Sequence, residues 1–244
     1  MNREYGSMTA METYGDNFVN DNLRYNTMRD MRAVTAVGGL ASFSSIVFAY
    51  DPRPLQDFCV ADLISTVRIN GLPCLDPATV KADDFFFRGL AQPGNTSNPA
   101  GAAVTPVGVS QIPGLNTLGL AIARLDYEAG GFFPPHYHPR GSEIHTVLEG
   151  SMEVGFVTSA PGFKFYSKVL EKGDVFVVPV GLVHYQRNVG AGKTVSIATF
   201  NSQNPGNSVI PNALFGSNPD IDSDYLAKSF ALDKETVERL QAVF

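Results

Sequence analysis

The sequence predicts an all-β protein, a jelly roll or barrel of antiparallel strands followed by a short helical tail. Between about residues 117 and 200, short β-prone runs alternate with turn signals rich in Gly and Pro. Their spacing is typical of an antiparallel sandwich or barrel and not of βαβ units. We expect the barrel core at about 105–205. The predicted strands are Leu118–Tyr127, Glu143–Leu148, Met152–Thr158, Phe165–Leu170, Val175–Val180, His184–Val189 and Thr194–Phe200.

The C-terminal region has a different periodicity. Beyond Pro219, apolar residues recur at mixed three- and four-residue steps, which is helical spacing, and Asp233 is placed to cap a helix over 234–243. A helix this short is not stable alone. We therefore expect the tail, about 221–244, to pack on the barrel or on a neighbouring subunit.

Length and charge limit the class of protein. The chain has 244 residues, 18 Lys and Arg against 24 Asp and Glu, and a net charge of −6, with no block of like charges. A protein that tracks the nucleic-acid backbone needs a clustered basic face, so nucleic acid is excluded as a partner. The length suits one large all-β domain.

The first fifty residues predict secretion. Residues 1–27 are polar and without periodicity, which indicates an unstructured extension or a start that belongs at Met28. Residues 28–49 have a weakly positive beginning and a charge-free apolar segment, the pattern of a signal peptide cleaved near Ala49. A membrane span is the alternative, but it needs about 20 strongly apolar residues. We expect a secreted chain, 50–244, without membrane attachment.

Cysteine use and a sequon agree with secretion. Cys59 and Cys74 are the only two cysteines. In an oxidising compartment they should pair, and closing a loop of about 15 residues contributes roughly 3 kcal/mol in the chain-entropy model. Two buried free thiols are the alternative. Asn95 begins the only N-x-[ST] sequon, in a loop-like run, and is a glycosylation candidate.

All four histidines lie between positions 136 and 184. On a strand, His136 and His138 share one face, Glu143 begins the next strand, and His184 can come from a third. Three imidazoles and one carboxylate suit a borderline or hard divalent metal. A single histidine on a strand is more often a core or surface residue, and an H-x-H pair alone is weak evidence.

The joint pattern is more specific. The chain reads G-x5-H-x-H-x4-E-x6-G from Gly130 to Gly150, and G-x5-P-x-G-x2-H-x3-N from Gly173 to Asn188. Both motifs match the two cupin motifs in their germin form, and the flanks match as well. Over about residues 50–244 the chain resembles a germin-like protein. The matching flanks are Pro54–Asp62, Asp84–Phe87, Gln111–Thr117 and Ser202–Gly206.

The resemblance implies a secreted plant glycoprotein with a β-barrel cupin core and a disulfide between Cys59 and Cys74. It also implies a homo-oligomer, in this family a hexamer in which terminal helices clasp neighbours, and a small-molecule substrate, superoxide or a small carboxylate. Mn(II) would be bound by four residues. These are His136, His138, Glu143 and His184.

The expected activity is superoxide dismutation, with a role in the extracellular matrix or defence. This reaction needs little beyond an accessible metal that cycles between two oxidation states, so the metal ligands themselves would be the catalytic residues. Family members that oxidise oxalate hold it with two Asn side chains, and the corresponding residues here are Ala123 and Phe133. Neither donates a hydrogen bond, so oxalate oxidation is not expected. The alternatives are another oxidase, a phosphodiesterase, or a non-enzymatic wall or receptor protein, as in the related auxin receptor.

Two more residues belong to the motifs. Strand alternation places His145 on the same interior face as Glu143, where it is either a hydrogen-bonded core residue or a residue that orients Glu143 or a metal-bound water. Asn188 is the last fixed position of the second motif. It either satisfies backbone groups where its strand ends or contributes near the site.

Overall fold

A computed structural model describes residues 55–67 and 71–244 of the chain. The predicted extension, 1–27, and the predicted signal peptide, 28–49, lie outside the described residues. Within the described ranges, no helix has the length and apolar character needed to cross a bilayer.

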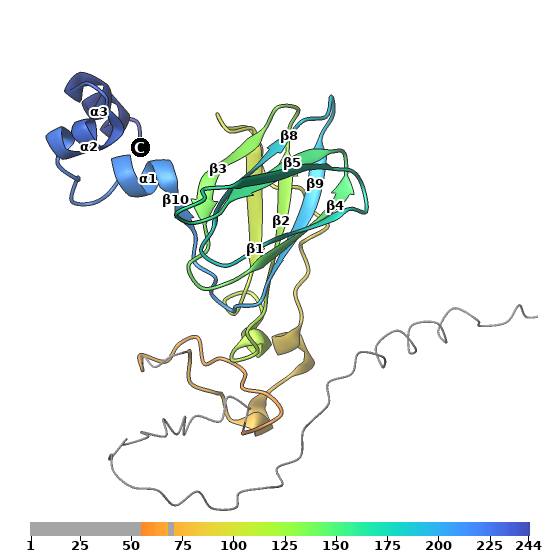
Figure 1. Ribbon diagram of the computed structural model, residues 1–244. Helices are drawn as coiled ribbons and strands as arrows, with labels where there is room; N and C mark the ends of the chain where they lie inside the picture. The colour runs from red at the N-terminus through yellow and green to blue at the C-terminus, as the bar shows by residue number, and fades with distance from the viewer. Residues whose placement is uncertain (1–54, 68–70) are drawn as a thin grey trace, which may run out of the picture. The chain divides into compact units, whose positions relative to one another are not determined.

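Two five-stranded antiparallel sheets build the barrel (Figure 1). One sheet has the order β1-β2-β9-β4-β7, and the other has the order β10-β3-β8-β5-β6. The predicted all-β jelly roll is therefore confirmed. The first sheet comprises β1 (Ala102–Val107), β2 (Ala121–Tyr127), β9 (Thr194–Phe200), β4 (Glu143–Glu149) and β7 (Val175–Val178). The second comprises β10 (Ser208–Val209), β3 (Phe132–Tyr137), β8 (Val183–Asn188), β5 (Met152–Val157) and β6 (Phe165–Leu170).

The strand bounds differ from the sequence predictions at identifiable residues. β2 begins three residues later than predicted because Thr117 and Gly119 adopt positive φ angles of 67° and 66°, which places Leu118 in a turn. β7 ends at Val178, before Pro179, which has no N–H for the ladder. β1 was not predicted, because Pro106 interrupts its pattern, and β10 is only two residues long.

Alternation along each strand separates the barrel interior from its surface. On β4, Glu143, His145 and Val147 are buried, whereas Ile144 between them is exposed. The buried side chains include an apolar cluster and, where Glu143 begins its strand, the four histidines. The core residues are Ala123, Leu125, Tyr127, Val147, Met152, Val154, Leu170, Val178, Ala198 and Phe200.

Three helices form a separate small core after β10. Asp222 and Asp233 cap α2 and α3, and each side chain accepts a bond from the backbone N–H three residues on. α1 contacts both β3 and α3, so it joins the predicted tail to the barrel (Figure 1). The helices are α1 (Ile210–Phe215), α2 (Ser223–Phe230) and α3 (Lys234–Gln241), and their core is Phe215, Leu226, Ala227 and Val237.

The segment before the barrel is tied down by the predicted disulfide. Cys59 and Cys74 are bonded, with Cα atoms 4.8 Å apart. The buried amide of Asn116 donates to Leu72 O at 2.8 Å, which fixes this arm to the loop before β2. The arm and that loop also contain three short 3-10 helices. These are η1 (Pro77–Thr79), η2 (Ala82–Phe85) and η3 (Pro113–Leu115).

Candidate metal centre

The four predicted ligands converge at one end of the barrel. Their ligand atoms all lie within 4.8 Å of one another, and all four side chains are buried. His136 and His184 face each other directly in the β3–β8 register, with ring centroids 4.0 Å apart. His138 lies one residue beyond β3, and Glu143 begins β4. The structure therefore brings together residues from three strands that are up to 48 positions apart in sequence.

Turn geometry places these residues. The pairing of β3 with β8 is irregular between Phe133 and His136, across the two prolines that interrupt the ladder. Gly181, at a positive φ of 77°, donates its N–H to His138 O at 2.9 Å. That bond joins the turn before β8 to the end of β3, so the second motif's glycine holds His184 next to His138.

Each ligand histidine is oriented by a backbone carbonyl. The Nδ1 of His136 lies 2.9 Å from Pro134 O, and the Nδ1 of His184 lies 2.9 Å from Leu182 O. The Nδ1 of His138 contacts Gly206 O. A carbonyl only accepts, so Nδ1 carries a proton in all three rings, and in the neutral ring Nε2 then presents its lone pair to the centre.

With this tautomer, the three imidazoles and the Glu143 carboxylate can bind a cation. The Nε2 of His184 lies 2.9 Å and that of His138 lies 3.3 Å from Glu143 Oε2. With the proton on Nδ1, these contacts bring lone pairs towards a carboxylate oxygen, which is repulsive unless a cation lies among them. Within the described residues, the buried Nε2 of His138 has no partner other than this carboxylate oxygen. Three imidazole nitrogens and one carboxylate oxygen are a set that divalent manganese, iron or zinc accepts.

The protonation states also suit metal binding. Burial, followed by the nearby His184, lowers the pKa of His136 to about 3. Burial alone raises the pKa of Glu143, but the surrounding His145, His138 and His184 reverse this and hold the pKa well below 4.5. Metal ligands must be neutral imidazole and ionised carboxylate, so both residues are ready for a metal at neutral pH.

His145 lies directly behind Glu143. It is fully buried, and its Nε2 is 2.9 Å from Glu143 Oε1 and 2.8 Å from Gln186 Nε2. The sequence predicted that His145 shares the face of Glu143, and the structure places it there. Gln186 was missed, although its position two residues after His184 on the same strand face is the signal that would have found it.

Asn188 lies four residues further along β8 and contacts the backbone of a turn. Its amide donates to Glu128 O at 2.8 Å and Gly192 O at 2.7 Å, and its oxygen accepts from Gly190 N at 2.8 Å. These bonds satisfy main-chain groups where the strand ends, so the interpretation of Asn188 as a residue near the metal ligands is not supported.

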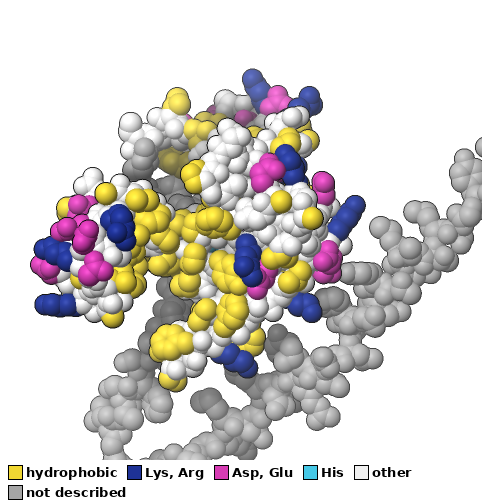
Figure 2. Space-filling model, turned by 90° about the horizontal axis from the view of Figure 1, so that it is seen from above, with side chains coloured by type: hydrophobic (Ala, Val, Ile, Leu, Met, Phe, Trp, Pro, Cys, Tyr) yellow, Lys and Arg dark blue, Asp and Glu magenta, His cyan; other side chains and the backbone are white. Residues whose placement is uncertain are grey.

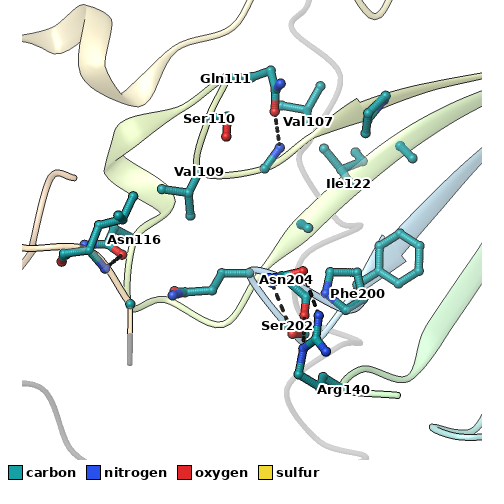
Figure 3. A pocket seen from close by; sticks show the side chains of 18 residues that line it. Val107, Val109, Ser110, Gln111, Asn116, Ile122, Arg140, Phe200, Ser202 and Asn204 are labelled. Atoms are coloured by element: carbon teal, nitrogen blue, oxygen red, sulfur yellow. Dashed lines mark hydrogen bonds between the residues drawn. The ribbon is translucent and has the colours of Figure 1, made fainter. Parts of the chain in front are cut away.

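Apolar side chains surround the ligands. The Phe133 ring packs edge-on against His136, with centroids 4.6 Å apart, and Phe200 packs edge-on against His138 at 4.9 Å. Phe200 also lines a cavity of about 740 Å³, together with the buried Ala123. Figure 3 shows Phe200 and Arg140 on one side of this cavity and Asn116 opposite.

The remaining predicted site residue, Asn95, is exposed on the loop before β1. Its side-chain oxygen accepts from Ser97 N at 3.0 Å, and the Thr96 hydroxyl donates to Glu128 Oε1 at 2.5 Å. The sequon therefore lies on the surface in a loop that is anchored to the end of β2.

Comparisons with known proteins agree with this geometry. The model of the cupin family matches residues 88–238. The chain is 56% identical over 205 residues to putative germin-like protein 2-1 of Oryza sativa subsp. japonica, covering 84% of this chain and 95% of that protein. The chain is a germin-like cupin. The resemblance predicted from the two motifs is thereby confirmed.

Solved structures share the fold of this germin-like cupin. An oxalate oxidase in complex with the substrate analogue glycolate is 45% identical, with a TM-score of 0.76, and the match covers 80% of this chain and 98% of that one. Peruvianin-I, described as a cysteine peptidase from Thevetia peruviana latex, is 43% identical, with a TM-score of 0.62 over 66% of this chain and 98% of that one. Both cysteines of this germin-like cupin are in its disulfide, so it has no thiol nucleophile.

Proposed function

We propose that this germin-like cupin is a secreted manganese(II) protein of the plant extracellular matrix, that it is a superoxide dismutase, and that it acts in defence or stress. The observation that carries the proposal is the convergence of three Nε2 lone pairs and one carboxylate oxygen in a buried site. Bound manganese would supply one-electron oxidation and reduction. The net reaction converts two superoxide ions and two protons into dioxygen and hydrogen peroxide.

The surrounding residues suit a small substrate. Four protein ligands would leave two positions of a six-coordinate ion for water or substrate. Phe133 and Phe200 cover His136 and His138 and restrict access by bulky molecules. A diatomic anion needs no organic recognition groups, so the apolar surroundings do not oppose its binding. The choice of manganese over iron or zinc rests on the family resemblance.

Oxalate oxidation is disfavoured by the residues next to the ligands. Ala123 and Phe133 stand where oxalate-oxidising germins hold their substrate with Asn. Each lost hydrogen bond to a charged group removes about 1.5–3 kcal/mol of binding free energy. Ala123 is buried at the cavity wall and Phe133 packs on a ligand ring, so neither offers a polar substitute.

A second candidate function is the binding of an organic carboxylate without turnover. The observation that favours it is the cavity of about 740 Å³, which is large enough for an aromatic acid and is separated from His138 by Phe200. An aromatic acid held in this cavity, beside the metal site, would make the protein a receptor or wall component.

Assembly as a homo-oligomer, in this family a hexamer, is supported by apolar residues on the outer face of the first sheet. Ile144, Val175 and Val177 are exposed on β4 and β7, where Ile144 pairs with Val177. Hydrophobic side chains also gather beside the helical unit, whose charged side chains lie on its outer edge (Figure 2). Burial of such surfaces between subunits would remove them from water.

The deciding experiment is a superoxide dismutase assay on the secreted protein, with its manganese content measured and His184→Ala compared beside it. Manganese-dependent activity that is lost in the variant would establish the enzyme. If fully loaded wild-type protein has no activity, the dismutase proposal fails. A stabilising thermal shift with aromatic acids would then favour the receptor.

A further inference from the structure

The two oxygens of the Glu143 carboxylate have different surroundings. Oε2 faces the metal-directed nitrogens of His184 and His138, at 2.9 Å and 3.3 Å. Oε1 lies 2.9 Å from the Nε2 of His145, which does not belong to the ligand set. Both Glu143 and His145 are buried, so water does not compete strongly for either oxygen.

The identity of these partners fixes the hydrogen on His145. An ionised carboxylate only accepts, and a carboxylate that ligates a metal is ionised. The Nε2 of His145 must therefore be the N–H donor to Oε1. Its other nitrogen, Nδ1, is buried and has no partner within the described residues, so Nε2 makes every hydrogen bond of this ring there.

The same argument fixes the orientation of the Gln186 side-chain amide. A protonated Nε2 cannot accept from the Gln186 NH₂ group 2.8 Å away. Gln186 Oε1 is buried and finds no partner in the described part of the chain. The oxygen and nitrogen of an amide are assigned from the bonds that they make. With the amide turned over, Oε1 accepts from His145, and the N–H is shared between Gln186 and Glu143.

We propose that His145, held by Gln186, is a positioning residue that reserves Glu143 Oε1 and so limits Glu143 to one oxygen, Oε2, as a metal ligand. The inference rests on the metal site of the proposed function but not on dismutase activity. Strand alternation places these side chains together in the barrel interior. His145 lies two residues after Glu143 on β4, and Gln186 lies two residues after His184 on β8.

The consequence concerns the positions left for substrate. On a six-coordinate ion, three imidazoles and one carboxylate oxygen would occupy four positions and leave two. A carboxylate with both oxygens free can bind through both, which would leave one position. His145 therefore keeps open a place for a second small molecule, such as water beside a bound substrate.

The test compares His145→Leu, which removes the donor, with His145→Gln, whose amide nitrogen can reach Oε1. Val147→Ala is the control, because Val147 is the next buried residue on the same face of β4. Each secreted protein is loaded with Mn(II). Electron paramagnetic resonance gives the zero-field splitting, and line broadening in ¹⁷O-water gives the number of bound waters.

We expect His145→Leu to change the zero-field splitting, to bind one water fewer, and to lower Mn(II) affinity by about 10–100-fold. His145→Gln and Val147→Ala should keep the wild-type spectrum and water number. Gln186→Met serves if His145→Leu does not fold, and should shift the spectrum in the same direction.

Equal spectra and water numbers for wild type and His145→Leu would overturn the inference, and so would a wild-type spectrum for Gln186→Met if the leucine variant does not fold. A wild-type protein that binds manganese without dismutase activity would overturn only the proposed enzyme. A wild-type protein that takes up no manganese would overturn both.

Discussion

Phe200 packs edge-on against the metal-ligand candidate His138, with ring centroids 4.9 Å apart, and the same side chain lines the large cavity at this end of the barrel. Phe200 also pairs with Glu143 across β4 and β9. Phe200 therefore contacts a candidate ligand, the strand that carries Glu143, and the cavity. The side chain therefore separates the cavity from the metal site.

Shortening this side chain should open the metal site to larger ligands. We expect Phe200→Ala to retain manganese and to bind an aromatic carboxylate at least tenfold more tightly than wild type, measured by calorimetry. The cost in stability is about 3–5 kcal/mol, because a buried Phe leaves a cavity. Leu170→Ala is the control, since Leu170 is a buried core residue of β6 outside the cavity lining. Equal affinities in both variants would contradict separation by Phe200.

The metal-free protein should lose stability on acidification between pH 6.5 and about 3. Burial lowers the pKa of His136 to about 3, so in this window the unfolded state binds a proton that the folded state does not. Glu143, with a pKa held well below 4.5, adds a further loss once the pH falls below 4.5.

His138 acts in the opposite direction. Burial lowers its pKa, but bonds to Glu143 and Gly206 outweigh this and raise it above 6.5, so its stabilisation is present below pH 6.5 and is lost as the pH rises through the raised value. Denaturant unfolding at pH 7, 5 and 4 measures the combined effect of these three residues on the free energy of unfolding. In His136→Gln the decline between pH 6.5 and 5 should be absent, and an unchanged decline there would show that another group causes it.

Breaking the disulfide should destabilise the arm before the barrel. Cys59 and Cys74 close a loop with a sequence separation of 15, so replacing both with Ser should cost about 2–4 kcal/mol of unfolding free energy. Chemical denaturation of the double variant measures this cost. Because the arm is also bonded through Asn116, Asn116→Ala in the oxidised protein provides a comparison that keeps the disulfide. No difference between wild type and the double variant would contradict this expectation.

The sequence predicted the ligand set but not how it is held. Ligand identity follows from His136, His138, Glu143 and His184 because period-two strands and two motifs put them on interior faces. The bonds that orient the rings go to backbone carbonyls, such as Leu182 O, and a carbonyl has no residue type that a pattern could reveal. β1 escaped prediction for a related reason, since its pairing with β2 is non-local and Pro106 weakens the local signal.

Two substitutions should restore recognition of a small organic acid. In Ala123→Asn/Phe133→Asn, two amides would stand beside the ligands, where Ala123 lines the cavity and Phe133 packs on His136. Each hydrogen bond to a charged ligand contributes about 1.5–3 kcal/mol. We therefore expect glycolate to bind at least tenfold more tightly to the double variant than to wild type, measured by calorimetry on the manganese-loaded proteins.

The matched control is Ala123→Leu/Phe133→Leu, which changes the volume at both positions without adding a donor. Glycolate affinity that rises in the Asn pair and not in the Leu pair would show that hydrogen bonding, and not space, keeps small dicarboxylates and hydroxy acids from wild type. If wild type already binds glycolate as tightly as the Asn pair, Ala123 and Phe133 do not decide the matter, and the argument against oxalate oxidation falls with that result.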